Sequence, residues 1–201
     1  MSSSPLLPLR IVDGLELDDK YRQVLRPGEI IKDREGRGRR LPRFFYEIDS
    51  NKTAQETQLA THFALWEFIN TDAREAKALH GFPRYIPCAV TLLALHLEVL
   101  REKVGAYVRI AANGGYRSPA HKLTRYASPH NWGTAANIYQ IGDEYLDEQE
   151  KIERYNEIAM RLLPGVWTRP YGHNVGFADD HMHLDLGYVT VVPRGGAGEE
   201  A

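Results

Sequence analysis

The sequence predicts a single α+β domain in which a small, mostly antiparallel sheet packs against helices. Its 201 residues are enough for one well-buried domain. Segments with apolar residues at helical spacing precede and interrupt a few short segments rich in aromatic and β-branched residues. No internal repeat is visible, and this order of elements indicates an α+β domain.

Residues 1–52 are predicted to form an N-terminal extension that packs on the domain or covers its cleft. They read as irregular up to a short strand over 43–48, where aromatic and β-branched residues gather. Between Arg22 and Arg43, eight Arg or Lys residues face three acidic ones. We expect this basic segment to be a solvated hairpin or loop rather than an arm that binds a polyanion.

Residues 53–192 are predicted to form the main domain. Its first part, 53–69, reads as helical because apolar residues recur at spacings of three and four. The clearest helix begins near Ile86 and runs to Val104, where an apolar stripe ends at Gly105.

The rest of the domain combines short strands with one charged helix. Strands are predicted over 106–112 and 134–142, a helix over 146–163, and a late strand or hairpin over 181–192. The Gly-rich acidic tail, 193–201, is predicted to be disordered.

Composition narrows the classes of partner and location. A net charge of −2 argues against a general affinity for nucleic acid. No window approaches the apolar run that a membrane span needs, and no signal peptide is visible. The chain as given is therefore predicted to be cytoplasmic, with a released or exported form left open. The single cysteine, Cys88, cannot form an internal disulfide and is expected to be an inert core residue.

Three motifs carry the residues most able to do chemistry. The run NGGYRSP places Arg117 on a tight turn, and His130 opens a second run, HNWGTAANI. A third run, DHMHLD, places His181 and His183 two residues apart on a predicted strand. Side chains at positions i and i+2 of a strand leave the same face, so both histidines can enter one site. This pattern indicates metal binding or acid-base chemistry.

The same motifs resemble those of the zinc D-alanyl-D-alanine carboxypeptidases and endopeptidases, the metallopeptidases that trim bacterial cell-wall (peptidoglycan) peptides. The family pattern is roughly S-G-Y-R-S-P, then H-x-x-G-x-A-x-D, then a late H-x-D. The similarity runs from about Thr61 to Gly187 and includes the upstream segments HFALWEF and VRIAANGGYRSP. It implies that residues 53–192 form a metallopeptidase-like domain, a zinc-dependent hydrolase whose substrates are short D-amino-acid peptides.

The resemblance implies zinc ligands at His130, Asn137 and His183. The second ligand of the family is an aspartate, and its position here holds Asn137. A neutral amide oxygen neither neutralises the charge of Zn²⁺ nor competes well with water. Three alternatives follow: Asn137 ligates weakly through its carbonyl oxygen, His181 completes a three-histidine site, or the site holds no metal.

Three further residues are candidates for catalysis. Arg117 matches the family arginine that binds the substrate carbonyl or carboxylate; its structural alternative is a salt bridge that fixes the turn, for example to Asp185. Asp180 stands where one branch of the family has an acidic residue, and His181 stands where another has a histidine. Either can be the acid or base, although Asp180 can also be part of a polar turn before the strand.

Two functions of different classes follow from these residues. The first is a zinc-dependent carboxypeptidase- or dipeptidase-like hydrolase. The second is a metal-poor, catalytically inactive relative that uses the same cleft to bind a peptide or a protein. Asn137 favours the second function, whereas the retained histidines, Asp180 and Arg117 favour the first.

Overall fold

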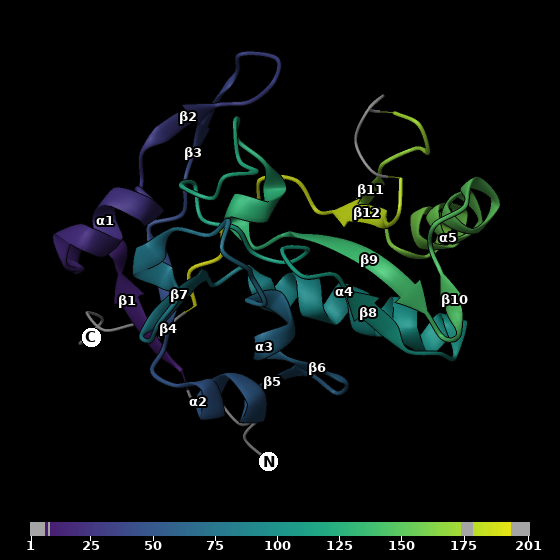
Figure 1. Cartoon of the computed structure of the whole chain (residues 1–201), viewed down its shortest axis with the longest axis horizontal. Coiled ribbons are helices and arrows are strands. Elements are labelled where there is room, and N and C mark those ends of the chain that lie inside the picture. The colour runs from purple at the N-terminus through teal and green to yellow at the C-terminus, as the bar shows by residue number, and fades with distance from the viewer. Residues whose placement is uncertain (1–6, 8, 174–178, 194–201) are drawn as a thin grey trace.

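The computed structural model describes residues 7, 9–173 and 179–193, and these form an α+β fold (Figure 1). Antiparallel sheets and hairpins pack with the helices around one main hydrophobic core. The predicted fold class is confirmed.

The larger sheet has five antiparallel strands with β9 at its centre. β9 (Ala135–Ile141) pairs along one edge with β8 (Val108–Ile110), and along the other with β12 (Met182–Asp185) and β10 (Glu144–Tyr145); β11 (Trp167–Thr168) pairs with β12. The strands predicted over 106–112 and 134–142 are therefore confirmed as β8 and β9. Strand β12 confirms the predicted late strand, and the described residues that follow it form no further strand.

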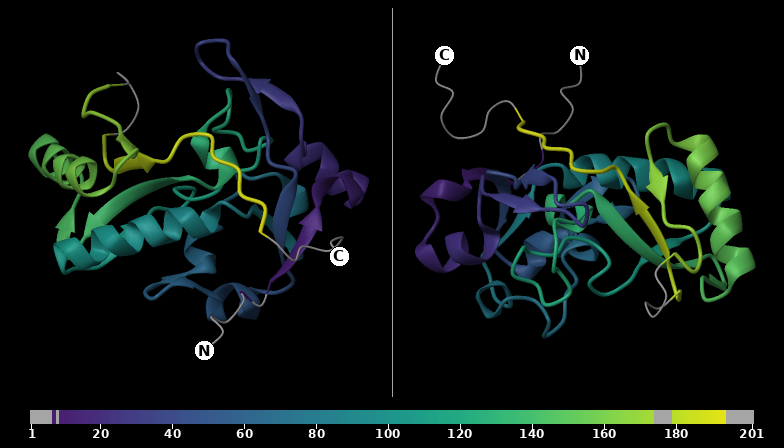
Figure 2. Two further views of the ribbon diagram at one scale, coloured as in Figure 1. Left: turned by 180° about the vertical axis from the view of Figure 1, so that it is seen from behind. Right: turned by 90° about the horizontal axis from the view of Figure 1, so that it is seen from above.

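Two long helices lie beside this sheet. α4 (Val90–Val104) runs alongside it, and α5 (Gln149–Leu162), the predicted charged helix, lies next to β11 and β12 (Figures 1 and 2). Leu93, Leu97 and Leu100 line the buried face of α4 at spacings of four and three. Gly105 ends α4 in the left-handed conformation, with φ of 63°.

A second sheet joins the N-terminal extension to the rest of the molecule. β4 (Phe44–Ile48) lies between β1 (Arg10–Asp13) and β7 (Arg84–Pro87), and η1 (Gly14–Glu16) and α1 (Asp19–Leu25) follow β1. The strand predicted over 43–48 is confirmed. The expectation that the first fifty residues are otherwise irregular is wrong. β1 forms because it pairs with β4, and the local sequence does not predict that pairing.

The basic segment forms a hairpin of β2 (Ile30–Lys32) and β3 (Gly38–Arg40), as expected. Asp33 is buried at its turn, where its carboxylate accepts from the backbone N–H of Arg37 at 2.8 Å and from Nε of Arg39 at 2.9 Å. Part of the positive charge of the segment is therefore neutralised within the hairpin itself.

Two predicted helices are wrong in extent. The stretch 53–69 holds the end of α2 (Asn51–Glu56), the hairpin of β5 (Gln58–Ala60) and β6 (Phe63–Ala64), and α3 (Leu65–Phe68). The carboxylate of Glu98 on α4 accepts from the backbone N–H of His62 at 2.8 Å and holds this hairpin turn. Ile86 lies in β7 because this segment pairs with β4, so α4 begins only at Val90.

Apart from Pro193, the tail predicted to be disordered lies outside the described residues. No helix in the described part of the chain is long and apolar enough to cross a bilayer.

Candidate functional site

Strand register places two of the predicted ligands side by side. In the ladder between β12 and β9, His183 lies directly opposite Asn137. The Nδ1 atom of His183 lies 2.9 Å from the Oδ1 atom of Asn137. Directly opposed side chains leave the same face of a sheet, so this contact follows from the register.

The third predicted ligand, His130, comes from η3 (Pro129–Trp132), a short 3-10 helix before β9. Its side chain is buried, and its Nδ1 atom donates to the carbonyl oxygen of Gly115 at 2.8 Å. The ring centroids of His130 and His183 lie 5.2 Å apart. The structure therefore brings the three predicted ligands into one place.

The turn that carries Arg117 is held by backbone hydrogen bonds on both sides. The N–H of Tyr116 donates to the carbonyl of Phe68 at 2.7 Å, and the N–H of Arg117 donates to the carbonyl of His130 at 3.2 Å. A Cβ atom on Gly115 would lie 2.4 Å from the Phe68 oxygen, so only glycine allows this close approach.

The hydrogen bonds of the two histidines decide which ring nitrogen carries a proton. Because a carbonyl accepts, His130 is protonated on Nδ1, and its Nε2 lone pair has no partner among the described residues. The Nε2 atom of His183 lies 2.9 Å from a carboxylate oxygen of Asp185, so it carries the proton and leaves a lone pair on Nδ1. Metal-binding histidines usually have this arrangement, with one N–H donated to a carbonyl or carboxylate.

Burial keeps both rings in the form that binds metal. It lowers the pKa of His130 well below its ordinary value, and the positive charge of Arg117 adds to this effect. Burial also lowers the pKa of His183, although the hydrogen bond to Asp185 opposes the shift. Both imidazoles are therefore neutral at pH 7.

His181 is engaged elsewhere. Its Nδ1 atom donates to a carboxylate oxygen of Asp180 at 2.7 Å, and its Nε2 atom accepts from the guanidinium of Arg169 at 3.1 Å. Burial lowers the pKa of His181, so the ring is neutral and Asp180 fixes its proton on Nδ1. With its lone pair held by Arg169, His181 does not complete a three-histidine site in this arrangement.

Among the described residues, Asp180 forms a hydrogen bond to His181 and to no other histidine. Its side chain is 66% exposed, and its one hydrogen bond within the described residues is the bond to His181. The structure thus places Asp180 behind His181, as the group that orients the ring.

Arg117 is partly buried and keeps most of its donors unused. Its Nε atom donates to the carbonyl of Asn113 at 2.5 Å, and its two NH₂ groups have no partner among the described residues. The salt bridge to Asp185 that was its structural alternative does not form. Burial lowers the pKa of Arg117 to about 10, helped by the charges of Arg74 and Arg169, so the group stays positive at neutral pH.

Glu75, which no motif singled out, anchors the turn next to Arg117. This buried carboxylate accepts from the backbone N–H of Ser118 at 3.1 Å and from its hydroxyl at 2.6 Å. Its negative charge also raises the pKa of Arg117, against the effect of burial.

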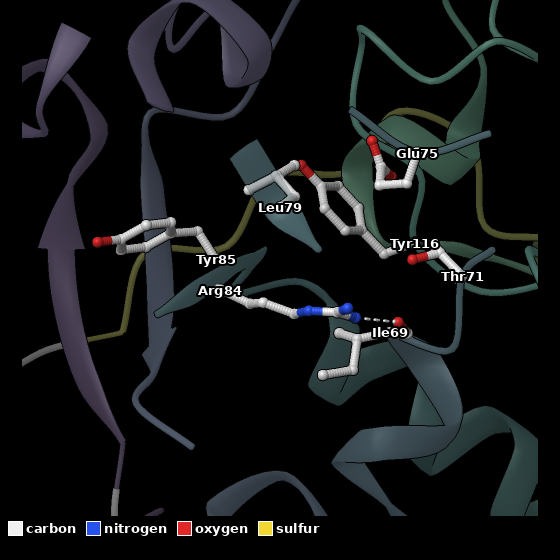
Figure 3. A pocket seen from close by; sticks show the side chains of 7 residues that line it. All are labelled: Ile69, Thr71, Glu75, Leu79, Arg84, Tyr85 and Tyr116. Carbon is white, nitrogen blue, oxygen red and sulfur yellow. Dashed lines mark hydrogen bonds between the residues drawn. The ribbon is translucent and has the colours of Figure 1, made fainter. Parts of the chain in front are cut away.

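A small cavity lies beside Glu75, with a volume of about 20 Å³ (Figure 3). Its lining comprises Ile69, Thr71, Glu75, Leu79, Arg84, Tyr85 and Tyr116. The hydroxyl of Tyr116 and the Nε atom of Arg84 are buried without a partner among the described residues. Figure 3 shows the Arg84 side chain extending to the Ile69 carbonyl, to which it donates at 2.8 Å.

Sequence reasoning missed two polar residues of the site, Arg169 and Glu75. They stand in no motif, and only the folded chain brings them to the histidines and to the Arg117 turn. Trp167 on β11 also lies near the site: it is 44% exposed, and its ring centroid lies 5.6 Å from that of His183. Trp132 is buried in a small separate cluster.

The donor set fits a zinc ion in part. Nδ1 of His183 and Oδ1 of Asn137 both carry lone pairs and lie 2.9 Å apart. Two hydrogen-bond acceptors at this distance repel each other. The repulsion is removed if a cation lies between them or if the amide turns its NH₂ group to the ring. Nε2 of His130 supplies a third donor. The described residues contain no group of three His, Cys, Asp or Glu side chains that could hold a metal, so a third ligand from this site has to be Asn137.

Comparisons with models of protein families, with curated proteins and with solved structures found no match to this chain.

Proposed function

We propose that the chain is a zinc-dependent carboxypeptidase- or dipeptidase-like hydrolase of short D-amino-acid peptides, with a metal site weakened by Asn137. One observation carries the proposal. His130 and His183 each donate one ring N–H to a fixed acceptor, Gly115 or Asp185, and each keeps the other nitrogen free of a proton. Histidines that serve only to hold the fold have no need of such a matched pair of lone pairs 5.2 Å apart by ring centroid.

Each residue then has a definite task. His130, His183 and Asn137 would hold the zinc ion, which would supply Lewis-acid activation of water and of the scissile carbonyl. Arg117 would bind the peptide carbonyl or carboxylate through its two NH₂ groups. Asp180 would keep the proton of His181 on Nδ1, so that Nε2 accepts a proton once Arg169 leaves it.

A second candidate function is supported by the contact between Asn137 and His183. If the amide turns its NH₂ group toward Nδ1, it donates a hydrogen bond that satisfies the ring without any metal. The cleft would then bind a peptide and leave it intact. The hydrolase and the peptide-binding function both depend on the contact between Asn137 and Nδ1 of His183. Metal affinity is therefore the property that distinguishes the two functions.

The first experiment is a zinc titration against a competing chelator, on wild type and on Asn137→Asp. The substitution restores an anionic ligand without a change of size, so we expect zinc affinity to rise on the order of tenfold or more. Asn51→Asp, which adds the same charge at an exposed position on α2, is the matched control and should leave zinc affinity unchanged. Equal affinity of wild type and Asn137→Asp would contradict a ligand role for Asn137.

Hydrolysis is measured on the same proteins with added zinc and a short peptide that ends in D-Ala-D-Ala. Cleavage by wild type, faster in Asn137→Asp, is the expected result. If both proteins bind zinc and neither cleaves, the peptide-binding function stands in place of the hydrolase.

A further inference from the structure

We propose that a groove beside the sheet of β1, β4 and β7 binds an organic cation, a short alkyl chain that ends in a primary ammonium group. The groove has a volume of about 250 Å³ and is lined by β1, by residues 16–18, and by Glu47 and Tyr85. No residue that lines it belongs to the candidate functional site. The inference is therefore independent of the hydrolase and of its metal.

The register of this sheet places three of the lining side chains in one row. Arg10 on β1 lies opposite Glu47 on β4, and Glu47 lies opposite Tyr85 on β7. Directly opposed side chains leave the same face of a sheet, so all three face the groove. Tyr21 on α1 packs at the end of the row, with its ring edge-on to that of Tyr85 and 4.9 Å between the centroids.

The hydroxyl of Tyr85 is a polar group of the groove that lacks a partner. Tyr85 is 5% exposed, yet its hydroxyl has no hydrogen-bond partner among the described residues. Figure 3 shows this hydroxyl at the end of the ring that points away from Arg84 and from the small cavity beside Glu75. Because the same side chain lines the groove, the hydroxyl is directed into that space. Buried polar groups nearly always have a partner, and a ligand in the groove would supply one.

Four carboxylates and one guanidinium line the groove, and two of the carboxylates are paired with arginines. The two carboxylate oxygens of Asp13 accept from Nε of Arg43 at 2.8 and 2.9 Å. Glu47 forms a longer ion pair with Arg10, at 3.4 Å. The one cation of the lining is thus already paired, so the groove has little to offer an anion.

Glu16 and Asp18 supply the negative charge that is left over. Neither carboxylate has a hydrogen bond or an ion pair among the described residues. Asp18 stands at the N-cap of α1, where an aspartate usually accepts from a backbone N–H of the first turn, but its side chain forms no such bond. Two carboxylates therefore stay available to a cation in the groove.

A primary ammonium group on an alkyl chain suits these partners. It donates three hydrogen bonds, which a phenol oxygen and carboxylate oxygens accept. Burial raises the pKa of Tyr85 to about 12, and the charges of Glu47 and Asp18 add to this effect, so the hydroxyl is neutral at pH 7. The volume of about 250 Å³ far exceeds the roughly 10–15 Å³ that one water needs, which favours a ligand of several atoms over a bare metal ion. Ile11 and Leu17 offer apolar contacts to its chain.

An NMR titration of the full chain tests the proposal, with amide chemical shifts as the readout. The probes are putrescine, the diol of the same chain length, and Nα-acetyl-lysine methylamide. We expect putrescine to shift the amides of residues 10–18, 47 and 85, and the diol, which keeps the chain without the charge, to leave them unchanged. The lysine derivative distinguishes the source of the ammonium group. If it binds more tightly than putrescine, the ligand is a lysine side chain, and if it binds more weakly, the ligand is a free diamine.

Two variants test which groups hold the ammonium. Tyr85→Phe removes an oxygen that has no partner in the described chain, so we expect unchanged urea denaturation and a putrescine affinity lower by about three- to tenfold. Glu16→Gln combined with Asp18→Asn should lower the affinity by about tenfold or more, because it removes the two unpaired charges. Asp19→Asn is the matched control, since Asp19 lies next to Asp18 but outside the groove and pairs with Arg22. It should change the affinity by less than about twofold.

Three results would each overturn the proposal. The first is the absence of amide shifts with both putrescine and the lysine derivative. The second is an equal response to the diol, and the third is an affinity in Tyr85→Phe and in the double variant that equals that of Asp19→Asn. None of these results bears on zinc affinity or hydrolysis, so failure here is distinct from failure of the proposed function.

Discussion

Asn137 differs from aspartate only by an NH₂ group in place of an oxygen, yet the exchange changes the charge of the site by one unit. With Arg117 nearby and no carboxylate among the three predicted ligands, the ligand set itself carries no negative charge. A dication is attracted less to such a site, while an anion is attracted more. In the proposed function, Asn137 is therefore the side chain on which metal affinity depends most.

A second test at the scale of single residues compares two hydroxyl groups of the Arg117 turn. The hydroxyl of Tyr116 is buried without a partner among the described residues, whereas that of Ser118 donates to Glu75 at 2.6 Å. We expect Tyr116→Phe to change the free energy of unfolding by less than about 0.5 kcal/mol, and Ser118→Ala to lower it by about 1–3 kcal/mol.

Urea denaturation of the two variants and of wild type measures both effects. Each substitution deletes one hydroxyl, so the pair serves as its own control. A loss above about 1 kcal/mol in Tyr116→Phe would show that an ordered water occupies the neighbouring cavity, whose volume of about 20 Å³ is enough for one.

At the scale of elements, the turn after β8 depends on a backbone contact that excludes every side chain. A Cβ atom on Gly115 would lie 2.4 Å from the oxygen and 2.7 Å from the Cα of Phe68, and neither backbone atom can move aside. Gly115→Ala should therefore lower the free energy of unfolding by about 1–3 kcal/mol. It should also weaken zinc binding, because the Gly115 carbonyl orients His130.

Gly81→Ala provides the control for this element. Gly81 is exposed, its φ lies outside the left-handed region, and a Cβ atom there meets nothing within 4 Å. Denaturation and chelator competition should give wild-type values for Gly81→Ala. A stable Gly115→Ala variant with normal zinc affinity would mean that the turn is not what positions His130.

The sequence was most informative where structure depends on neighbours along the chain. The apolar stripe and Gly105 predicted the body and the end of α4, and strand composition predicted β8 and β9. It failed where a partner far away decides the structure. Residues 57–64 carry apolar side chains at a spacing that suits a helix, but the Glu98 carboxylate, 36 residues from His62, holds them as a hairpin.

In the candidate site too, the sequence predicted some residues and missed others. The ligand positions could be proposed because motif residues mark them, and the alternation of strand side chains predicted that His183 points into a site. Arg169 and Glu75 could not be proposed, since their roles arise from the pairing of β12 with β9 and β11 and from the packing of the 71–79 segment under the turn. No pattern in the sequence encodes those contacts.

At the scale of the whole molecule, buried histidines make stability depend on pH. Burial lowers the pKa values of His121, His130, His181 and His183 in the folded state below the unfolded value of about 6.5. Below that pH these histidines bind protons in the unfolded chain but not in the folded chain. Their contribution to the free energy of unfolding is therefore complete above about pH 6.5 and is lost as the pH falls. Each such histidine contributes a slope of up to about 1.4 kcal/mol per pH unit.

Chemical denaturation of metal-free protein between pH 7 and pH 5 measures this slope. We expect the free energy of unfolding to fall steadily over that range, and His130→Gln to reduce the slope by the share of one histidine. A flat profile would mean that the rings accept protons in the folded state, in conflict with their burial.

The central position of β9 makes the backbone of the candidate site rigid. Asn137 lies on a strand that is hydrogen-bonded along both edges, and His183 lies on β12, which is also paired on both sides, with β9 and β11. Backbone amides in such strands exchange with solvent only through large-scale opening of the domain. If a ligand binds at these two residues, as we propose, the cost in conformational entropy is small, because the strands are ordered in advance.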